Sequence, residues 1–321
     1  MSKAIEASGL RKHYPPDVQA LDGLDLAVDE GTIFALLGPN GAGKSTTVKI
    51  LTTLTRADSG EARVAGYDVL AQPERVRRTI GVVGQKHGFD PEATGRENLD
   101  LQGAIYDLPG GEIKKRSAEL LERFNLSDAA GRAVKTYSGG MQRRLDIAMG
   151  LVNRPEALFL DEPTTGLDPE ARVDLWQEIE RLTRDERMTI LLTTHYLEEA
   201  DELAANVAIV DRGRIVAHGT PESLKSDLEG DTLQFELAEV ADVTVLTTLE
   251  AVEGVTEVAV DGRQVRARAK NGATAMPPAL AALDAAGHSV ASATMARPSL
   301  DEVYLRHTGR SFRAAEEAIA S

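Results

Sequence analysis

The stretch GPNGAGKST at residues 38–46 decides the fold of this chain. It fits the pattern G-x-x-x-x-G-K-[ST] and lies between an apolar run, TIFALL at 32–37, and a helical pattern that begins near Thr47. In this strand–loop–helix context the pattern surrounds a phosphate with backbone N–H groups, and a plain glycine turn is the alternative. We expect Lys44 to reach the β- and γ-phosphate oxygens and Ser45 to offer its hydroxyl to Mg²⁺. The loop contains Gly38, Pro39, Asn40, Gly41, Ala42, Gly43, Lys44, Ser45 and Thr46.

Short apolar runs alternate with helical segments around this loop. The runs at 32–37, 157–160, 189–194 and 207–210 indicate buried strands, and 170–183 indicates a helix between two of them. Alternating strands and helices predict an α/β fold with a parallel sheet covered on both faces. Between 88 and 154 the pattern is mostly helical, which predicts an inserted helical subdomain. Its helices are expected near 95–106, 112–124 and 139–152.

Polar side chains follow two of the expected strands. Asp161 and Glu162 come directly after ALFL, and His195 comes directly after TILLTT. Neighbouring residues of a strand point to opposite sides, so Asp161 can join a magnesium shell while Glu162 faces an attacking water. The strand-end position of His195 favours contact with the γ-phosphate. From the residues alone, a solvated acidic turn and a structural histidine are the alternatives.

A second candidate phosphate contact lies in YSGGMQRRLD at residues 137–146. Ser138 is a natural N-cap for the helix that follows, because its hydroxyl can accept a free first-turn N–H. Gly139 and Gly140 each cost about 1 kcal/mol relative to alanine inside a helix. They also leave bare N–H groups at the positive end of the helix, which favours an anion there.

The sequence changes character after a polar stretch at 226–231. A strand at 232–237, a helix at 241–251, a hairpin over 255–269 with an Asp-Gly turn, a helix at 275–286, a strand at 289–295 and a helix from Ser299 are expected. The order βαββαβ predicts a small α+β, ferredoxin-like domain. We therefore expect a first domain at 1–228, a C-terminal domain at 231–310 and a tail at 311–321.

The composition narrows the function classes. The chain has 321 residues, a formal net charge of −15 and no cysteine. The charge argues against broad binding to nucleic acid or anionic lipid, and the lack of cysteine excludes disulfides and thiolate zinc sites. No apolar run approaches the roughly 20 residues that span a bilayer, and the first residues lack the apolar core of a signal peptide. We expect a cytoplasmic protein without a nucleic-acid partner.

Taken together, these motifs resemble the ATP-binding subunit of ABC transporters over about residues 4–225. YSGGMQ is similar to the family signature LSGGQ, although Tyr137 replaces its leucine and Met141 its glutamine. Gln85 in GVVGQ matches the Q-loop, Asp168 in TTGLD the D-loop, and Tyr14 the aromatic residue that stacks on adenine. YSGGM, TGRENL and RPSLDEVYLRHTGR also resemble exporters of the daunorubicin- and doxorubicin-resistance type, which extends the resemblance to about residue 310.

The resemblance implies an ATP- and Mg²⁺-dependent ATPase that works as a homodimer. ATP would lie between the P-loop of one copy and Ser138, Gly139 and Gly140 of the other. Gln85 would be both a magnesium ligand and a catalytic residue, together with Glu162 and His195. A separately encoded integral membrane permease would recruit the dimer to the cytoplasmic face of the membrane. Export of hydrophobic drugs or antibiotics is the leading interpretation. The alternatives are an exporter of lipid or polysaccharide and a soluble ABC ATPase acting on ribosomes or DNA, while the role of the C-terminal domain stays open.

Overall fold

The computed structural model describes residues 2–228, 230–296 and 298–312. The described chain forms two compact units, residues 2–220 together with Phe312, and Pro221–Ser311, and each is described by itself. Across the described residues, no helix combines the length and the apolar character that crossing a membrane requires.

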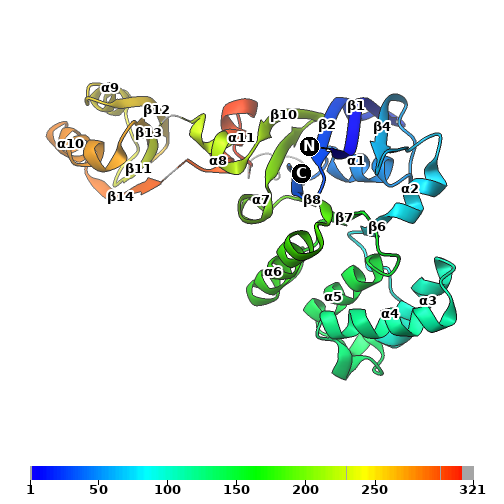
Figure 1. Ribbon diagram of the computed structural model, residues 1–321. Coiled ribbons are helices and arrows are strands. Elements are labelled where there is room, and N and C mark those ends of the chain that lie inside the picture. Colours follow the sequence, from blue (N-terminus) through cyan, green and yellow to red (C-terminus); the bar gives the residue numbers. More distant parts are fainter. Residues whose placement is uncertain (1, 229, 297, 313–321) are drawn as a thin grey trace. The chain divides into compact units, whose positions relative to one another are not determined.

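A six-stranded sheet with the order β10-β9-β3-β8-β7-β6 is the centre of the first unit (Figure 1). Its strands are β3 (Ile33–Leu37), β6 (Ile80–Val83), β7 (Ala157–Asp161), β8 (Thr189–Thr194), β9 (Asn206–Asp211) and β10 (Arg214–Gly219). All neighbours are parallel except the edge pair β9 and β10. Every residue of β3, β7 and β8 is buried, because helices or a second sheet cover both faces. The four expected buried strands are confirmed.

The same unit contains a second, antiparallel sheet that the sequence analysis did not predict. Its order is β2-β1-β4-β5, with β1 (Lys3–Tyr14), β2 (Val18–Asp29), β4 (Ser59–Val64) and β5 (Tyr67–Asp68). One face of β1, β2 and β4 joins the main hydrophobic cluster with Phe34 and Phe159 of the central sheet. The helices of this part are α1 (Lys44–Leu51), α2 (Pro73–Thr79), α6 (Pro169–Glu186) and α7 (Leu197–Leu203).

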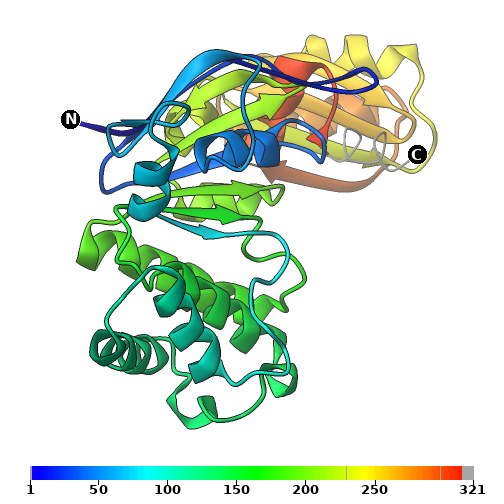
Figure 2. The ribbon, with the colours of Figure 1, turned by 90° about the vertical axis from the view of Figure 1, so that its right-hand side faces the viewer.

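The expected helical insertion forms between β6 and β7. It contains α3 (Gly95–Ile105), α4 (Gly110–Arg123), α5 (Gly139–Gly150) and two short 3₁₀ turns at Ser127–Ala129 and Val134–Thr136. Figures 1 and 2 show α3, α4 and α5 grouped on one side of the unit, away from β1 and β2. Helix α3 begins at a capping box, because the Thr94 side chain accepts from the Glu97 N–H and the Glu97 carboxylate accepts from the Thr94 N–H.

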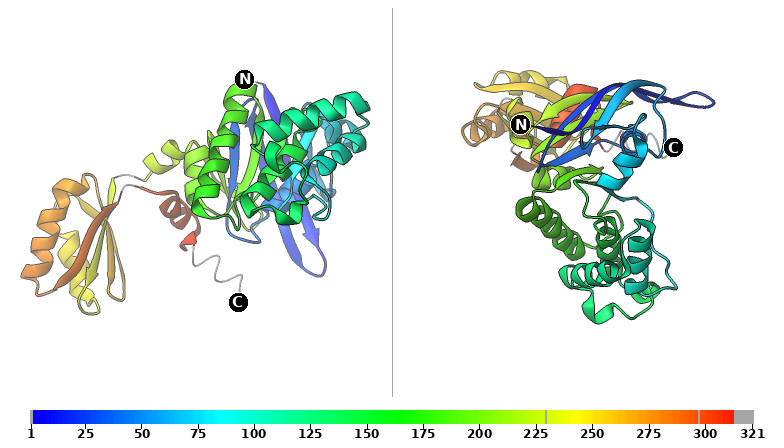
Figure 3. Two further views of the ribbon diagram at one scale, coloured as in Figure 1. Left: turned by 90° about the horizontal axis from the view of Figure 1, so that it is seen from below. Right: turned by 45° about the vertical axis from the view of Figure 1, so that its right-hand side comes forward.

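The second unit has the expected βαββαβ order. Its sheet runs β12-β13-β11-β14 with all neighbours antiparallel, which is the ferredoxin-like topology. Helices α9 and α10 pack their buried side chains on the apolar face of this sheet, around Phe235, and Figure 3 shows α10 lying along it. The elements are α8 (Pro221–Ser226), β11 (Asp231–Leu237), α9 (Val243–Glu250), β12 (Val255–Asp261), β13 (Gln264–Ala269), α10 (Gly272–Ala285), β14 (Val290–Ala296) and α11 (Leu300–Thr308).

Candidate nucleotide site

Strand register brings the candidate residues to one edge of the central sheet. Leu37, the last residue of β3, pairs with Thr194, and Asp161, the last residue of β7, pairs with Thr193. The chain therefore leaves three adjacent parallel strands at the same level. Gly38, Glu162 and His195 are the next residues in the sequence after these strand ends. This carboxyl edge is where open α/β sheets bind their ligands.

Two glycines of the loop are required by packing as well as by phosphate approach. A Cβ on Gly38 would lie 2.4 Å from the carbonyl oxygen of Val210 in β9. Gly43, the residue before α1, has a φ of +113°, and a Cβ there would lie 2.6 Å from the carbonyl oxygen of Ala20 in β2. The loop can therefore sit tightly between two strands only with glycine at both positions.

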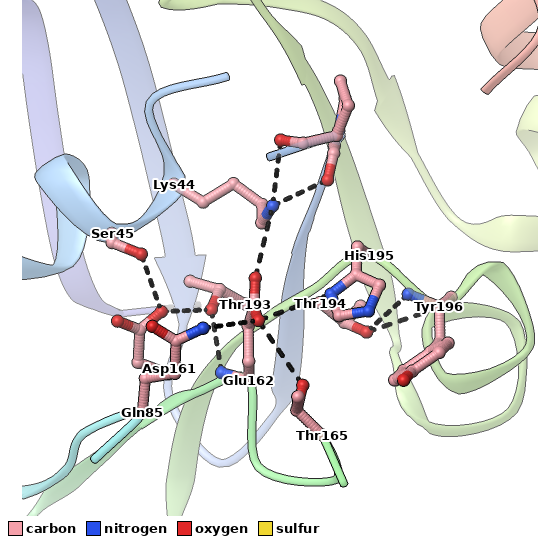
Figure 4. Close-up of polar contacts among 12 residues, drawn as sticks. Lys44, Ser45, Gln85, Asp161, Glu162, Thr165, Thr193, Thr194, His195 and Tyr196 are labelled. Carbon is pink, nitrogen blue, oxygen red and sulfur yellow. Dashed lines mark hydrogen bonds and ion pairs between the residues drawn. The ribbon is translucent and has the colours of Figure 1, made fainter. Parts of the chain in front are cut away.

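Lys44 is held at the centre of the site. Its Nζ donates to the carbonyl oxygens of Gly38 at 2.7 Å and Pro39 at 3.1 Å, and it lies 3.6 Å from Oε1 of Glu162 (Figure 4). The side chain is only 3% exposed. Burial of a cation is costly unless it is paired and hydrogen-bonded, and these three contacts provide that compensation. The loop thus fixes a positive charge beside its backbone N–H groups.

Asp161 accepts hydrogen bonds from two hydroxyl groups at the sheet edge. Its Oδ1 accepts from Ser45 Oγ at 3.1 Å and from Thr193 Oγ1 at 2.5 Å (Figure 4). Oxygen ligands of this kind suit Mg²⁺, which binds proteins through one or two carboxylates together with substrate phosphates. The donor set therefore fits a magnesium ion at Ser45 and Asp161.

Glu162 lies at the centre of the polar cluster, with a side chain only 7% exposed. Its Oε2 accepts from Gln85 Nε2 at 3.1 Å and from Thr165 Oγ1 at 3.4 Å, and it lies 3.4 Å from His195 Nδ1. The His195 contact, and then Lys44 and Gln85, lower the pKa of Glu162 below its ordinary value, although burial acts in the opposite direction. Glu162 is therefore a carboxylate at neutral pH and can accept a proton from water.

The backbone of Glu162 is also unusual. Its φ is +50°, in the left-handed region that non-glycine residues rarely occupy. Its N–H donates to the carbonyl oxygen of Thr193 at 3.1 Å and to Thr193 Oγ1 at 3.0 Å, so the neighbouring strand end holds this conformation. A strained residue held by its surroundings is typical of active sites.

The side chains of Lys44, Ser45, Gln85, Asp161, Glu162 and His195 thus come together beside the P-loop that holds Lys44. The predicted residues outside the P-loop and this cluster lie elsewhere in the first unit. Tyr14 ends β1, in the hairpin whose second strand packs on the P-loop at Ala20, and its ring faces Lys12 Nζ. Asp168 is the N-cap of α6 and accepts from the Ala171 N–H.

The signature segment begins α5 in the helical subdomain, apart from α1 in both Figures 1 and 2. Ser138 caps the helix by accepting from the Met141 N–H at 3.3 Å, and Ser138 and Gly139 are exposed. The side chain of Tyr137 is buried, and its hydroxyl donates to the Ala129 carbonyl oxygen at 2.8 Å. Tyr137 therefore anchors the subdomain, while Ser138, Gly139 and Gly140 stay accessible.

Arg143 is a central residue that the sequence analysis missed. The residue is 4% exposed, and its guanidinium donates to the carbonyl oxygens of Pro163 at 2.6 Å and Gly84 at 2.9 Å, with longer bonds to those of Asp161 and Glu162. It joins the signature helix to the segments that carry Gln85 and Glu162. The only sequence signal was a charged residue at a position of α5 that faces the core.

Asp146, one turn further along α5, continues this link. Its carboxylate contacts His87 Nδ1 at 2.5 Å, accepts from the Gly88 N–H at 3.0 Å and lies 3.8 Å from Arg143. The segment from Gly84 to Gly88 is thus held by α5 at both ends. A shift of the signature helix is therefore coupled to Gln85.

This fold and this edge of polar residues define a P-loop ATPase of the ATP-binding cassette class. The family model for the ABC transporter matches residues 21–165, and the model for the C-terminal domain of DrrA1-3-like ATP-binding proteins matches residues 219–308. The chain is 46% identical over 321 residues to the daunorubicin/doxorubicin resistance ATP-binding protein DrrA of Streptomyces peucetius, covering 99% of this chain and 96% of the relative.

Solved structures agree with this assignment. The chain is similar to cbiO1 of Clostridium perfringens, with a TM-score of 0.66, 25% identity and coverage of 71% of this chain and 92% of that one. The cassette MJ0796, dimeric in a post-hydrolysis state with ADP and Pi, gives a TM-score of 0.62 at 26% identity, covering 67% and 98%. The chain therefore belongs to the ABC transporter ATP-binding proteins of the daunorubicin/doxorubicin-resistance type. It binds and hydrolyses ATP to power transport.

The contacts of Arg143 generate a stability prediction. Arg143→Ala leaves buried carbonyl groups and Asp146 without their cation, so we expect the free energy of unfolding of the first unit to fall by about 3 kcal/mol. Arg143→Lys is expected to recover only part of this loss, because an ammonium cannot reproduce the planar fork. Urea unfolding measures both. The neighbouring Arg144→Ala is the control, and equal midpoints for Arg143→Ala and Arg144→Ala would contradict the central role of Arg143.

Proposed function

We propose that this chain energises the export of hydrophobic drugs or antibiotics through a separate membrane permease, at the cytoplasmic face of the membrane. The cluster of Lys44, Asp161, Glu162 and His195 at adjacent strand ends is the observation that carries the ATPase part of the proposal. The name of the Streptomyces peucetius relative supports the substrate class.

The exposed signature helix supports an ATP site shared by two copies. The N-terminus of α5 offers first-turn N–H groups, a helix dipole and the Ser138 hydroxyl, yet α5 lies away from α1, the helix that Lys44 begins. In the homodimer that we propose, it faces the γ-phosphate on the P-loop of the partner copy. The positive end of the helix then takes the part that an arginine finger plays in other P-loop enzymes.

The residues of the cluster have distinct roles in hydrolysis. Ser45, Asp161 and Gln85 would hold Mg²⁺, which supplies charge neutralisation on the phosphates. Glu162 accepts a hydrogen bond from the attacking water and takes its proton as the bond to the γ-phosphorus forms. The bond from the γ-phosphorus to the bridging oxygen breaks in the same displacement. His195 steadies a γ-phosphate oxygen, and Tyr14 stacks on the adenine.

A groove in the first unit supports docking of a permease helix. A cavity of about 510 Å³ lies between α2, β6 and the end of α3. Leu54, Val82 and Ile105 line it and are exposed. The charged side chains of the lining balance, with Arg77 and Arg78 beside Glu74 and Asp107. The exposed apolar residues fit a short apolar helix from a cytoplasmic loop of the permease. Gln85 comes two residues after the end of β6, so a short stretch of chain links the groove to the ATP site.

The catalytic assignment is tested with Glu162→Gln. The amide cannot accept the proton of water, so we expect ATP turnover to fall at least a hundredfold while ATP binding persists. The variant is also expected to accumulate as a dimer when ATP is added, measured by light scattering after size exclusion. Turnover close to that of the unchanged protein would refute the role of Glu162.

The groove is tested with Ile105→Asp, which places a charge on an exposed apolar position. We expect ATPase activity without permease to stay within about twofold. Recruitment to permease-containing vesicles is expected to fall at least tenfold, because the new carboxylate would lose its hydration against the apolar side chains of the permease helix. Leu70→Asp alters a similarly exposed residue outside the groove and is the control. Equal recruitment of the two variants would rule out this docking site.

A further inference from the structure

Glu199 is a buried carboxylate that the mechanism above does not use. It lies in α7, four residues after His195, and is 0% exposed. Its Oε1 accepts from Trp176 Nε1 of α6 at 3.0 Å, while Oε2 is buried without a hydrogen-bond partner. Thr164, Thr194, Arg172 and Arg143 also face this carboxylate. Burial raises its pKa, so the site holds a carboxyl group at considerable cost.

One stripe of α6 contacts the segment that carries His195. Arg172 and Trp176 are four residues apart, so they lie on the same face of the helix. The Arg172 guanidinium carbon is 4.5 Å from the centre of the Tyr196 ring, and that ring is 4.1 Å from the His195 ring, centre to centre. Trp176 holds the other end of the segment through Glu199. The segment 195–199 is therefore fastened to α6 at two points.

The segment needs such anchors because it has little structure of its own. Only His195 and Tyr196 lie between the end of β8 and the start of α7, and α7 has seven residues. A helix of this length is unstable by itself, so packing sets its direction. By contrast, α6 has 18 residues and its N-terminus is capped by Asp168, six residues after Glu162. The rigid helix can thus fix both sides of the His195–Glu162 contact.

We propose that Glu199 is a positioning residue for hydrolysis, which holds the His195 segment on α6 through its hydrogen bond to Trp176. In our proposal this bond keeps His195 Nδ1 within contact distance of Glu162. Figure 4 shows that contact between His195 and Glu162. Lys44 is held by the carbonyl oxygens of its own loop, at Gly38 and Pro39, and not by this bond. Loss of the bond therefore impairs the chemical step and leaves ATP binding intact. The inference rests on the role proposed for His195.

The test compares Glu199→Ala with two other variants in the full-length protein. Glu199→Ala is expected to lower kcat at least tenfold with ATP affinity unchanged within about twofold. Glu199→Gln keeps an acceptor oxygen for Trp176, so it is expected to recover kcat to within about threefold. Glu198→Ala removes the adjacent, exposed carboxylate and is the matched control. The unchanged protein is assayed first, because lack of turnover there would overturn the proposed function and not this inference.

For variants that fold, the fluorescence of Trp176 gives a second readout, located at the bond itself. Trp176 is the single tryptophan of the chain, so its emission reports the bond to Glu199 directly. We expect a shift of the emission in Glu199→Ala and none in Glu198→Ala or Glu199→Gln. Shifted emission with unchanged kcat in Glu199→Ala would overturn the proposal.

A second variant decides the case if Glu199→Ala does not fold. Trp176→Phe keeps a smaller aromatic ring and removes the N–H donor of the same bond. Reduced kcat with unchanged ATP affinity supports the proposal, and a kcat equal to that of the unchanged protein refutes it. If both single variants fold, the double variant is expected to be no slower than the slower single one, because both changes break one interaction.

Discussion

The alignment of three parallel strand ends is the constraint on which the site depends. Because β3, β7 and β8 end at the same level, the P-loop, Glu162 and His195 leave the sheet side by side. Lys44 and Glu162 are both buried, and such a pair is stable only when further polar contacts compensate their lost hydration. The carbonyls of the loop, Gln85 and Thr165 supply those contacts. Register and charge pairing together preorganise the cluster for phosphoryl transfer.

A second set of contacts joins the polar cluster to the helices around it. Arg143 and Asp146 connect the signature helix to the segment of Gln85. Trp176 connects α6 to the segment of His195 through Glu199. Each link uses a buried polar side chain, which is costly unless its partners are in place. Through these links, a movement of the helical subdomain or of α6 would act on the strand ends. Tyr137 has a different role, since its ring and hydroxyl are buried within the helical subdomain itself.

The sequence predicted most of the central sheet because its buried strands are short apolar runs next to distinctive polar residues, as at Asp161 and His195. The ferredoxin-like unit was equally accessible, since its alternating strands and the Asp261-Gly262 turn carry strong local signals. The sheet of β1, β2, β4 and β5 was missed because its strands have exposed residues and irregular register. Arg143 and Glu199 were missed for a related reason: their importance comes from partners 18 to 59 residues away in the chain.

The proposed mechanism requires that each ATP site is built from two copies of the chain. Lys44→Ala removes the phosphate-binding cation, and Ser138→Asp keeps the helix cap but repels the phosphate, so each variant alone should be inactive. In a mixed dimer both defects fall in one site and the other site is intact. Equal mixing should therefore restore about a quarter of the unchanged activity if the two sites work independently. A mixture no more active than either variant alone would contradict the shared site.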